Sequence, residues 1–192
     1  GARGSATQVT SRPNHVVFEA SLCPDAQSIV FESHQVDVED NGVIFRYKRD
    51  GSEGYVPLTP AGMDCRQPVW SPTRDKIVCQ CKVGGQFAVF VMKTDGTTLT
   101  QVTGGAGEMT DPSFSSDGLM VVYSSNEGGL AQANLFVVPV TGGHSTRVTN
   151  YSGYDGAPSW SPDGTKIAFE SSPSDPDGSA GTKLYIIAAP SP

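Results

Sequence analysis

The sequence has 192 residues, of which 37% are hydrophobic and 17% charged, with a formal net charge of -7. A chain of this length can bury a real core. Because carboxylates are in excess, the chain lacks the broad positive potential that nucleic-acid binding needs. The longest apolar runs fall well short of the roughly 18 residues of a membrane span, and residues 1–10 show no targeting signal. We therefore predict a folded domain with no nucleic-acid partner and no membrane span.

Four copies of one pattern follow one another along the chain. Their apolar anchors are Leu22, Trp70, Phe114 and Trp160. The spacings of 48, 44 and 46 residues are close to the length of a propeller blade. After each anchor apolar residues alternate with other residues, as Ile77 and Cys79 do, which predicts a strand with one buried face.

Further strands are predicted in each copy. The next strand is an apolar run with an aromatic residue, as in residues 89–92 with Phe90. In the first three copies a turn and a short strand follow, and this strand ends in a threonine. These closing threonines are Thr59, Thr103 and Thr149. The fourth copy lacks this strand, whereas Thr7-Gln8-Val9-Thr10 nearly repeats Thr100-Gln101-Val102-Thr103.

We predict an all-β fold, a β-propeller of four four-stranded blades, with the ring closed by an N-terminal strand that completes the last blade. The blades span residues 16–59, 66–103, 110–149 and 156–188, with closing strand 7–10. Closure would remove the unpaired edges at the ends of the ring. In the alternative interpretation, the four copies belong to a longer array and the match between the chain ends is accidental. No helix is predicted, because no window shows a 3.6-residue period with a capping signal.

The most complete copy, residues 158–169, reads Pro-Ser-Trp-Ser-Pro-Asp-Gly-Thr-Lys-Ile-Ala-Phe. It resembles the WD-like repeats of the TolB propeller family, and the other three copies are degraded versions of it. The resemblance covers nearly the whole chain and implies a propeller, with a periplasmic or secreted location expected and a cytoplasmic one still open. Similar repeats occur in scaffolds that hold protein partners, in non-catalytic domains of peptidases and in some sugar-acid lyases, so the resemblance leaves the function open.

The repeated residues have structural interpretations. The Ser-Pro-Asp-Gly element is predicted to form the turn between the first two strands, since Asp bonds the local backbone and Gly accepts a positive φ. Trp70, Phe114 and Trp160 are expected to pack between adjacent blades. The four cysteines are interpreted as core thiols, because Cys79 and Cys81 have no second pair that would complete a zinc site.

Function is expected in the loops, because they vary between the copies while the repeated residues hold the scaffold. The longer loops join one blade to the next and join the middle strands, and both sets are predicted to lie on one acidic face. The candidate binding residues on this long-loop face are Arg12, His15, Asp64, Arg66, Glu108, Asp111, Tyr151, Tyr154 and Asp155.

We predict a non-catalytic scaffold that binds a protein or peptide partner through the long-loop face, with a basic partner favoured by charge. The alternative is a carbohydrate-binding or carbohydrate-active propeller of hydrolase or lyase type. A third interpretation is that the acidic loops only keep the protein soluble. No catalytic residue is assigned, because the three histidines fall in different copies and no catalytic motif is present. A monomer is expected, and an eight-bladed ring of two chains is the alternative.

No cofactor is predicted, although one loop resembles a calcium site. Asp37, Glu39 and Asn41 stand at the first, third and fifth positions of this loop and Gly42 at the sixth, but the twelfth is Lys48. A second acidic segment, residues 175–178, is better explained as a turn.

Overall fold

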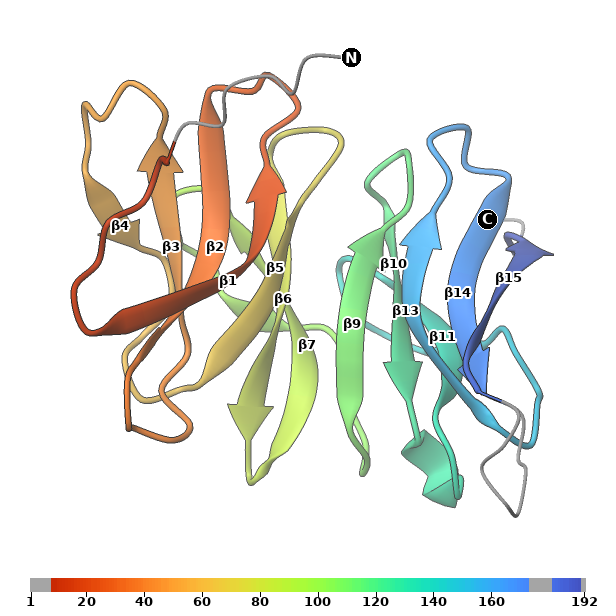
Figure 1. The fold of residues 1–192 in the computed structure, drawn as a ribbon. Helices are drawn as coiled ribbons and strands as arrows, with labels where there is room; N and C mark the ends of the chain where they lie inside the picture. Colours follow the sequence, from red (N-terminus) through yellow and green to blue (C-terminus); the bar gives the residue numbers. More distant parts are fainter. Residues whose placement is uncertain (1–7, 173–180, 191–192) are drawn as a thin grey trace.

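The computed structural model describes residues 8–172 and 181–190, which form four antiparallel sheets that follow one another in chain order (Figure 1). The first sheet contains β1 (His15–Leu22), β2 (Ser28–Gln35), β3 (Val43–Lys48) and β4 (Tyr55–Pro57). The second contains β5 (Cys65–Trp70), β6 (Lys76–Val83), β7 (Gln86–Lys93) and β8 (Thr100–Gln101). The third contains β9 (Met109–Phe114), β10 (Met120–Ser125), β11 (Asn134–Pro139) and β12 (Thr146–Arg147). The fourth contains β13 (Tyr154–Trp160), β14 (Lys166–Ser172) and β15 (Lys183–Ala188).

The all-β prediction is confirmed, with one small departure. A short 3-10 turn, η1 (Glu127–Gly129), follows β10, whereas no helix was predicted. In the described ranges, no helix is long and apolar enough to cross a membrane.

Successive sheets pack face to face, each against the first strand of the next. The middle strands of one sheet contact β5, β9 or β13 of the sheet that follows. We call β1, β5, β9 and β13 the inner strands. Trp70 and Phe114 are buried at these junctions, as predicted. Trp160 is only half-buried, so the anchor with the best-preserved sequence is not the best-buried one.

The predicted turn between the first two strands of a blade is present. In the fourth sheet, Asp163 accepts hydrogen bonds from the Ser161 hydroxyl at 2.6 Å and from the Thr165 amide at 3.0 Å. These bonds stabilise the carboxylate and lower the pKa of Asp163 to about 2. Gly164 has a φ of 75°, a conformation that glycine adopts without steric cost. The element is therefore structural, as its sequence indicated.

Each inner strand carries the same irregularity three residues before its anchor. The strand register shifts at this point in all four sheets. The residues concerned are Glu19, Gln67, Asp111 and Ala157, with φ between 46° and 55°. Non-glycine residues in this left-handed region carry a cost of roughly 1 kcal/mol or more. Because the same β-bulge recurs in every sheet, it is a regular feature of this repeat rather than a local defect.

The three closing threonines fasten the outer strands to the middle of each sheet. The backbone N–H groups of the residues opposite them donate to the buried threonine hydroxyls. The pairs are Ile44 with Thr59 at 3.0 Å, Val89 with Thr103 at 2.9 Å, and Leu135 with Thr149 at 2.9 Å. Valine has the shape of threonine but no acceptor, so it would leave a buried N–H unpaired.

We expect Thr103→Val to lower the free energy of unfolding by roughly 1 to 2 kcal/mol, the cost of one unpaired buried amide. Thr100→Val is the matched control, because Thr100 is exposed in β8, and it should change stability by less than about 0.5 kcal/mol. Denaturant titration of both variants measures the difference. Equal losses in the two variants would contradict the assigned role of the hydroxyl.

The predicted ring closure is not confirmed. The fourth sheet has three strands among the described residues, and residues 8–10 belong to no strand. The Ser11 amide instead donates to the Tyr55 hydroxyl at 2.7 Å, and the Arg12 guanidinium carbon lies 3.7 Å from the centre of the Phe45 ring. The aromatic side chains of the first sheet therefore hold residues 11 and 12 beside that sheet. Residue 7 lies outside the described residues.

A disulfide joins Cys65 and Cys81, which corrects the interpretation of all four cysteines as thiols. The two residues face each other across β5 and β6, so the strand register decides the pairing. Cys79 lies on the same side of β6 as Cys81, with their sulfur atoms 3.7 Å apart, because side chains two residues apart on a strand share a face. Burial raises the pKa of the Cys79 thiol to about 12, which disfavours the reactive thiolate.

Peptide mapping without reduction should recover Cys65 linked to Cys81, with Cys23 and Cys79 alkylated only after denaturation. Replacing both linked residues with alanine should cost about 3 kcal/mol, because the bond closes a loop with a sequence separation of 16. Alkylation of Cys65 in the denatured, unreduced protein would refute the linkage.

Candidate functional site

Residues of all four inner strands line one open hollow. Its volume is about 350 Å3, and residues of β1, β5, β9 and β13 all line it. Three polar bulge residues, Glu19, Gln67 and Asp111, face this axial hollow, while the fourth bulge residue, Ala157, is apolar. The bulges therefore place side chains from four separate repeats around one small space.

A chain of hydrogen bonds connects the bulges of the second and third sheets to the sheets before them. Glu32 accepts from the Gln67 amide at 2.6 Å, and the Gln67 side chain donates to Asp111 at 2.7 Å. The Asp111 amide donates to Gln80 at 2.9 Å. We call Glu32, Gln67, Gln80 and Asp111 the axial polar chain. These bonds hold the strained bulges in place. The Asp111 carboxylate already accepts a hydrogen bond from the Gln67 side chain.

Sequence analysis missed Glu32 and Gln80, although a signal was present. Both stand ten residues after an anchor, and the same position holds Ser124 and Glu170 in the other copies. A polar residue repeated within an otherwise apolar strand predicts a buried polar contact. Only the structure shows that the contact is the bulge amide of the next sheet.

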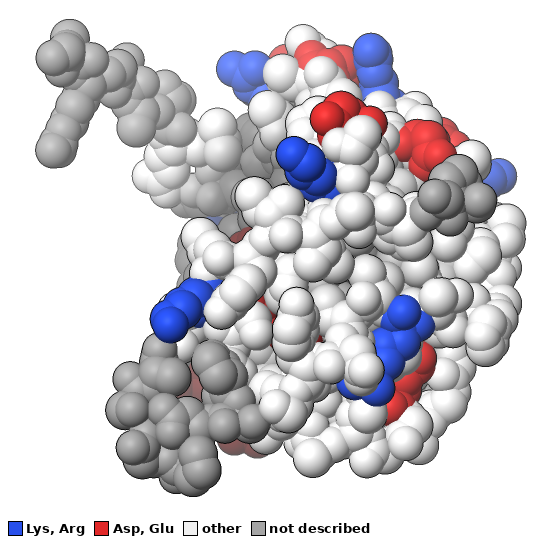
Figure 2. Space-filling view, turned by 90° about the vertical axis from the view of Figure 1, so that its right-hand side faces the viewer, with Lys and Arg blue, Asp and Glu red and all other residues white. Residues whose placement is uncertain are grey.

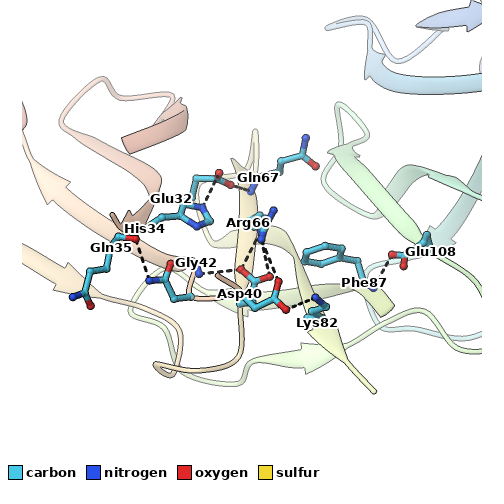
Figure 3. A network of polar contacts seen from close by, with 12 residues as sticks. Glu32, His34, Gln35, Asp40, Gly42, Arg66, Gln67, Lys82, Phe87 and Glu108 are labelled. Atoms are coloured by element: carbon cyan, nitrogen blue, oxygen red, sulfur yellow. Dashed lines mark hydrogen bonds and ion pairs between the residues drawn. The ribbon is translucent and has the colours of Figure 1, made fainter. Parts of the chain in front are cut away.

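A second network lies where the first two sheets meet (Figure 3). Arg66 donates to both carboxylate oxygens of the buried Asp64, at 3.0 and 2.9 Å, and Asp64 also accepts from the Gly42 amide at 2.9 Å. Lys82 donates to Asp40 at 2.6 Å. This bond to Lys82 lowers the pKa of Asp40, and the bond to Asp64 raises that of Arg66. Both cations are therefore bound by carboxylates of the protein itself.

The two sets of long loops share one face, as predicted. Asp40 in the β2–β3 loop is 3.7 Å from Arg66, which lies at the start of the second sheet. Glu108, just before β9, accepts from the amide of Phe87 at 2.9 Å. Its own amide donates to Asn126 at 2.8 Å. These contacts join the loops of three consecutive sheets on the side shown in Figure 3.

Arg66→Ala should destabilise the protein by about 2 kcal/mol, because it leaves the buried Asp64 carboxylate without its cation. Adding Asp64→Asn should recover part of this loss, since a neutral amide needs no counter-charge. Lys76→Ala, which removes an exposed ion pair with Asp75, is the control and should cost less than about 0.5 kcal/mol. A loss for Arg66→Ala no larger than the control would show that Asp64 needs no cation.

Tyr154 and Asp155 occupy the fourth sheet. The Tyr154 hydroxyl lies over Gly156, where an added Cβ would meet it at 1.9 Å. Burial, followed by the charges of Asp111 and Glu170, raises the pKa of Tyr154. Tyr154 is therefore close to the acidic hollow. Asp155 is fully buried, and neither of its carboxylate oxygens has a hydrogen-bond partner among the described residues.

The remaining candidates are not brought to the hollow. Arg12 stacks on the first sheet, and its burial lowers its pKa. His15 bonds the Pro13 carbonyl at 2.9 Å, and Tyr151 is exposed on the loop before β13. The binding roles of all nine candidates remain predictions.

The calcium hypothesis also remains a prediction. Asp37 and the neighbouring Asp40 have positive φ, and the Asn41 side chain donates to the Gln35 carbonyl at 3.4 Å. No cluster of three or more His, Cys, Asp or Glu residues suited to a metal ion occurs in the described part of the chain. The second acidic segment, residues 175–178, lies outside the described residues.

The sequence profile of the TolB beta propeller domain matches residues 57–175, which is more than half of the chain. No match to a curated protein was found.

Solved structures share the fold at low sequence identity. A protein described as TolB from Agrobacterium tumefaciens has a TM-score of 0.73 and 20% identity, covering 88% of this chain and 60% of its own. TolB from Acinetobacter baumannii has a TM-score of 0.70 and 19% identity, covering 90% and 41%. An oligogalacturonate lyase in complex with manganese has a TM-score of 0.70 and 14% identity, covering 92% and 51%. The chain thus spans less than two thirds of each of these proteins.

Proposed function

The chain belongs to the TolB beta propeller family, and we propose that it is a non-catalytic scaffold that binds a basic segment of a protein or peptide partner around the axial hollow. The observation that carries the proposal is the acidic hollow itself, which all four inner strands line. A repeated scaffold that brings loops and bulges from separate copies to one place is suited to surround one ligand.

The distribution of charge supports a basic ligand. Glu19 and Asp111 line the hollow, and Glu170 is near enough to affect Tyr154. Two cations on this face, Arg66 and Lys82, are bound to Asp64 and Asp40. The potential in the hollow is therefore negative, and it would attract lysine or arginine side chains and repel anionic sugars.

The size of the hollow favours a side chain over a large ligand. A volume of about 350 Å3 lies at the lower end of the range for ligand pockets. One or two long basic side chains would fit, with the rest of the partner resting on the surrounding loops. Tyr154, at the edge of this region, offers an aromatic surface of the kind enriched among binding hot spots.

The disulfide supports a location for this function. Structural disulfides persist in oxidising compartments and are rare in the cytosol of most organisms. The Cys65–Cys81 bond therefore favours the periplasm or the cell exterior, which is where we propose that the partner is met.

The proposal predicts salt-dependent binding of an arginine- and lysine-containing peptide, measured by calorimetry or fluorescence anisotropy. Replacing Glu19 with Gln and Asp111 with Asn should weaken binding by about tenfold, because two partly exposed charges contribute roughly 1.4 kcal/mol together. Affinity should also fall as salt rises, since exposed charges are screened.

The control removes the same charge elsewhere. Asp50→Asn with Asp95→Asn neutralises two exposed turn carboxylates outside the hollow and should leave the affinity unchanged. If both double variants lose affinity equally, the peptide responds to net charge alone and the site is not at the hollow. Binding of a neutral oligosaccharide in place of the peptide would support the carbohydrate-binding alternative.

A further inference from the structure

A second pocket opens where the outer parts of the second and third sheets meet. Its volume is about 530 Å3, and none of its lining residues lines the axial hollow. Both of the sheets that flank it have four strands, so the pocket belongs to an interior junction of the described chain. We call it the outer pocket, and the lining residues on which the argument rests are Gly104, Gly105, Glu127, Phe136, Ser145 and Arg147.

The first sheet shows which group fits against the aromatic ring of this pocket. Phe136 is paired with Tyr123 in the third sheet as Phe45 is paired with Phe31 in the first. The two rings of each pair stack, with centres 5.9 and 6.0 Å apart. The guanidinium carbon of Arg12 lies 3.7 Å from the centre of the Phe45 ring. The protein itself thus places an arginine at the position that corresponds to the outer pocket.

Two glycines leave this position open in the third sheet. Arg12 is the second residue after Thr10, and Gly105 is the second residue after the closing Thr103. Gly104 likewise stands where the first copy has a serine. A Cβ added to either glycine would meet nothing within 4 Å. The outer pocket is therefore the counterpart of the space that the Arg12 side chain occupies on the first sheet.

The outer pocket has a carboxylate without a cation. Glu127 forms no ion pair within the described residues. The Tyr123 hydroxyl lies 2.7 Å from the Ser145 hydroxyl and 3.4 Å from a carboxylate oxygen of Glu127. Burial raises the pKa of Glu127, while the bond from Tyr123 and the charge of His144 act in the opposite direction. A guanidinium that stacks on Phe136 and binds Glu127 would combine a cation–π contact with charge-assisted hydrogen bonds.

Arg147 gives the outer pocket a positive group as well. Its Nε donates to the Thr149 carbonyl at 2.7 Å, and its Nη2 donates to the Asn134 side-chain oxygen at 2.7 Å. Both acceptors are uncharged, and in the described ranges Arg147 forms no ion pair. The other N–H groups of the guanidinium remain for a ligand, and a carboxylate is the group that they bind best. The pocket thus suits a ligand with one cationic and one anionic group.

Charge alone would not direct such a ligand to the side of the molecule that the fourth sheet forms. Figure 2 shows that acidic and basic groups of the described residues are interspersed there among uncharged ones. A ligand with one charge of each sign instead needs a concave site in which a few polar groups fix its orientation. The outer pocket combines an acid, a base and an aromatic ring in this way.

We propose that the outer pocket binds the C-terminal arginine of a peptide. The guanidinium stacks on Phe136 and pairs with Glu127, and the terminal carboxylate pairs with Arg147. The opposite charges of Glu127 and Arg147 match those of this one residue, whereas an arginine inside a peptide would leave Arg147 without a carboxylate. The inference is independent of the ligand of the axial hollow, because the two sites share no residue.

Titration of the whole protein with Nα-acetylarginine tests the proposal. This probe has the guanidinium and the carboxylate of a C-terminal arginine and no free α-amino group. A Kd of about 1 mM or tighter is expected for a ligand of this size. In NMR spectra the amide signals of Gly104, Gly105 and Gly128 should shift, since these residues line the pocket, whereas those of Gly54 and Gly62 should not. No shift of the pocket glycines at about 10 mM, a concentration well above the expected Kd, would overturn the proposal.

Two analogues of the probe test its two charges separately. Nα-acetylcitrulline has the same shape with an uncharged urea in place of the guanidinium, and Nα-acetylargininamide has no carboxylate. Each should bind about tenfold more weakly, because each loses a charge-assisted contact. Equal affinity for the citrulline derivative would refute binding of the guanidinium. Equal affinity for the amide would refute recognition of the C-terminus.

Charge variants identify the residues that bind the probe. Glu127→Gln and Arg147→Gln should each weaken binding of Nα-acetylarginine by about tenfold. Arg147→Gln should also remove the preference for the acid over the amide. Asp95→Asn and Lys93→Gln remove one charge of each sign at exposed positions outside the pocket and should leave the affinity unchanged. Equal losses in the variants and their controls would show a response to net charge and overturn the proposal.

A side chain at position 104 tests the location of the site. Gly104 does not have a positive φ, and a Cβ there would meet nothing within 4 Å, so Gly104→Leu requires no change of the backbone. The added side chain should fill part of the outer pocket and abolish detectable binding, while the melting temperature stays unchanged. Undiminished binding of Nα-acetylarginine by the folded variant would place the site elsewhere and refute the proposal.

Discussion

The structure depends on one repeated junction, in which the middle strands of each sheet pack on the inner strand of the next. Apolar contact supplies most of the stabilisation, because each junction buries residues such as Trp70 and Val89 from both sides. At the first two junctions a buried acceptor then binds the bulge amide, as Glu32 binds that of Gln67. A buried polar group of this kind would be costly if left unpaired, so it fixes the relative position of the sheets.

The same junction creates the candidate site. The bulge residues have strained backbones that persist only where their surroundings determine them. Because the bulges occur at the same place in each inner strand, residues from four copies face one hollow. On the long-loop face, Arg66 is engaged with Asp64. The hollow is therefore small and lined by two carboxylates, and hydrogen bonds hold the bulges of the second and third sheets beside it.

The ends of the molecule follow from the junction as well. A propeller blade cannot bury both of its faces alone, because each face needs a neighbouring sheet. In this chain the last face carries Leu184 and the first carries Leu22, both exposed. The packing that buries Trp70 and Val89 inside the molecule is thus absent at these two residues of the described chain.

The sequence by itself determined the repeat, the strands, the turns and the family, because these depend on local periodicity and on residues close together in the chain. Asp163 in its turn and Thr103 at its strand end are examples. The tertiary structure decided what depends on register and on contacts between copies. It paired Cys65 with Cys81, placed Gln67 and Asp111 at the hollow and left Arg12 on the first sheet. It also kept residues 8–10 away from the fourth sheet, because the aromatic contacts of the first sheet are local, whereas closure needs the two ends of the molecule to meet.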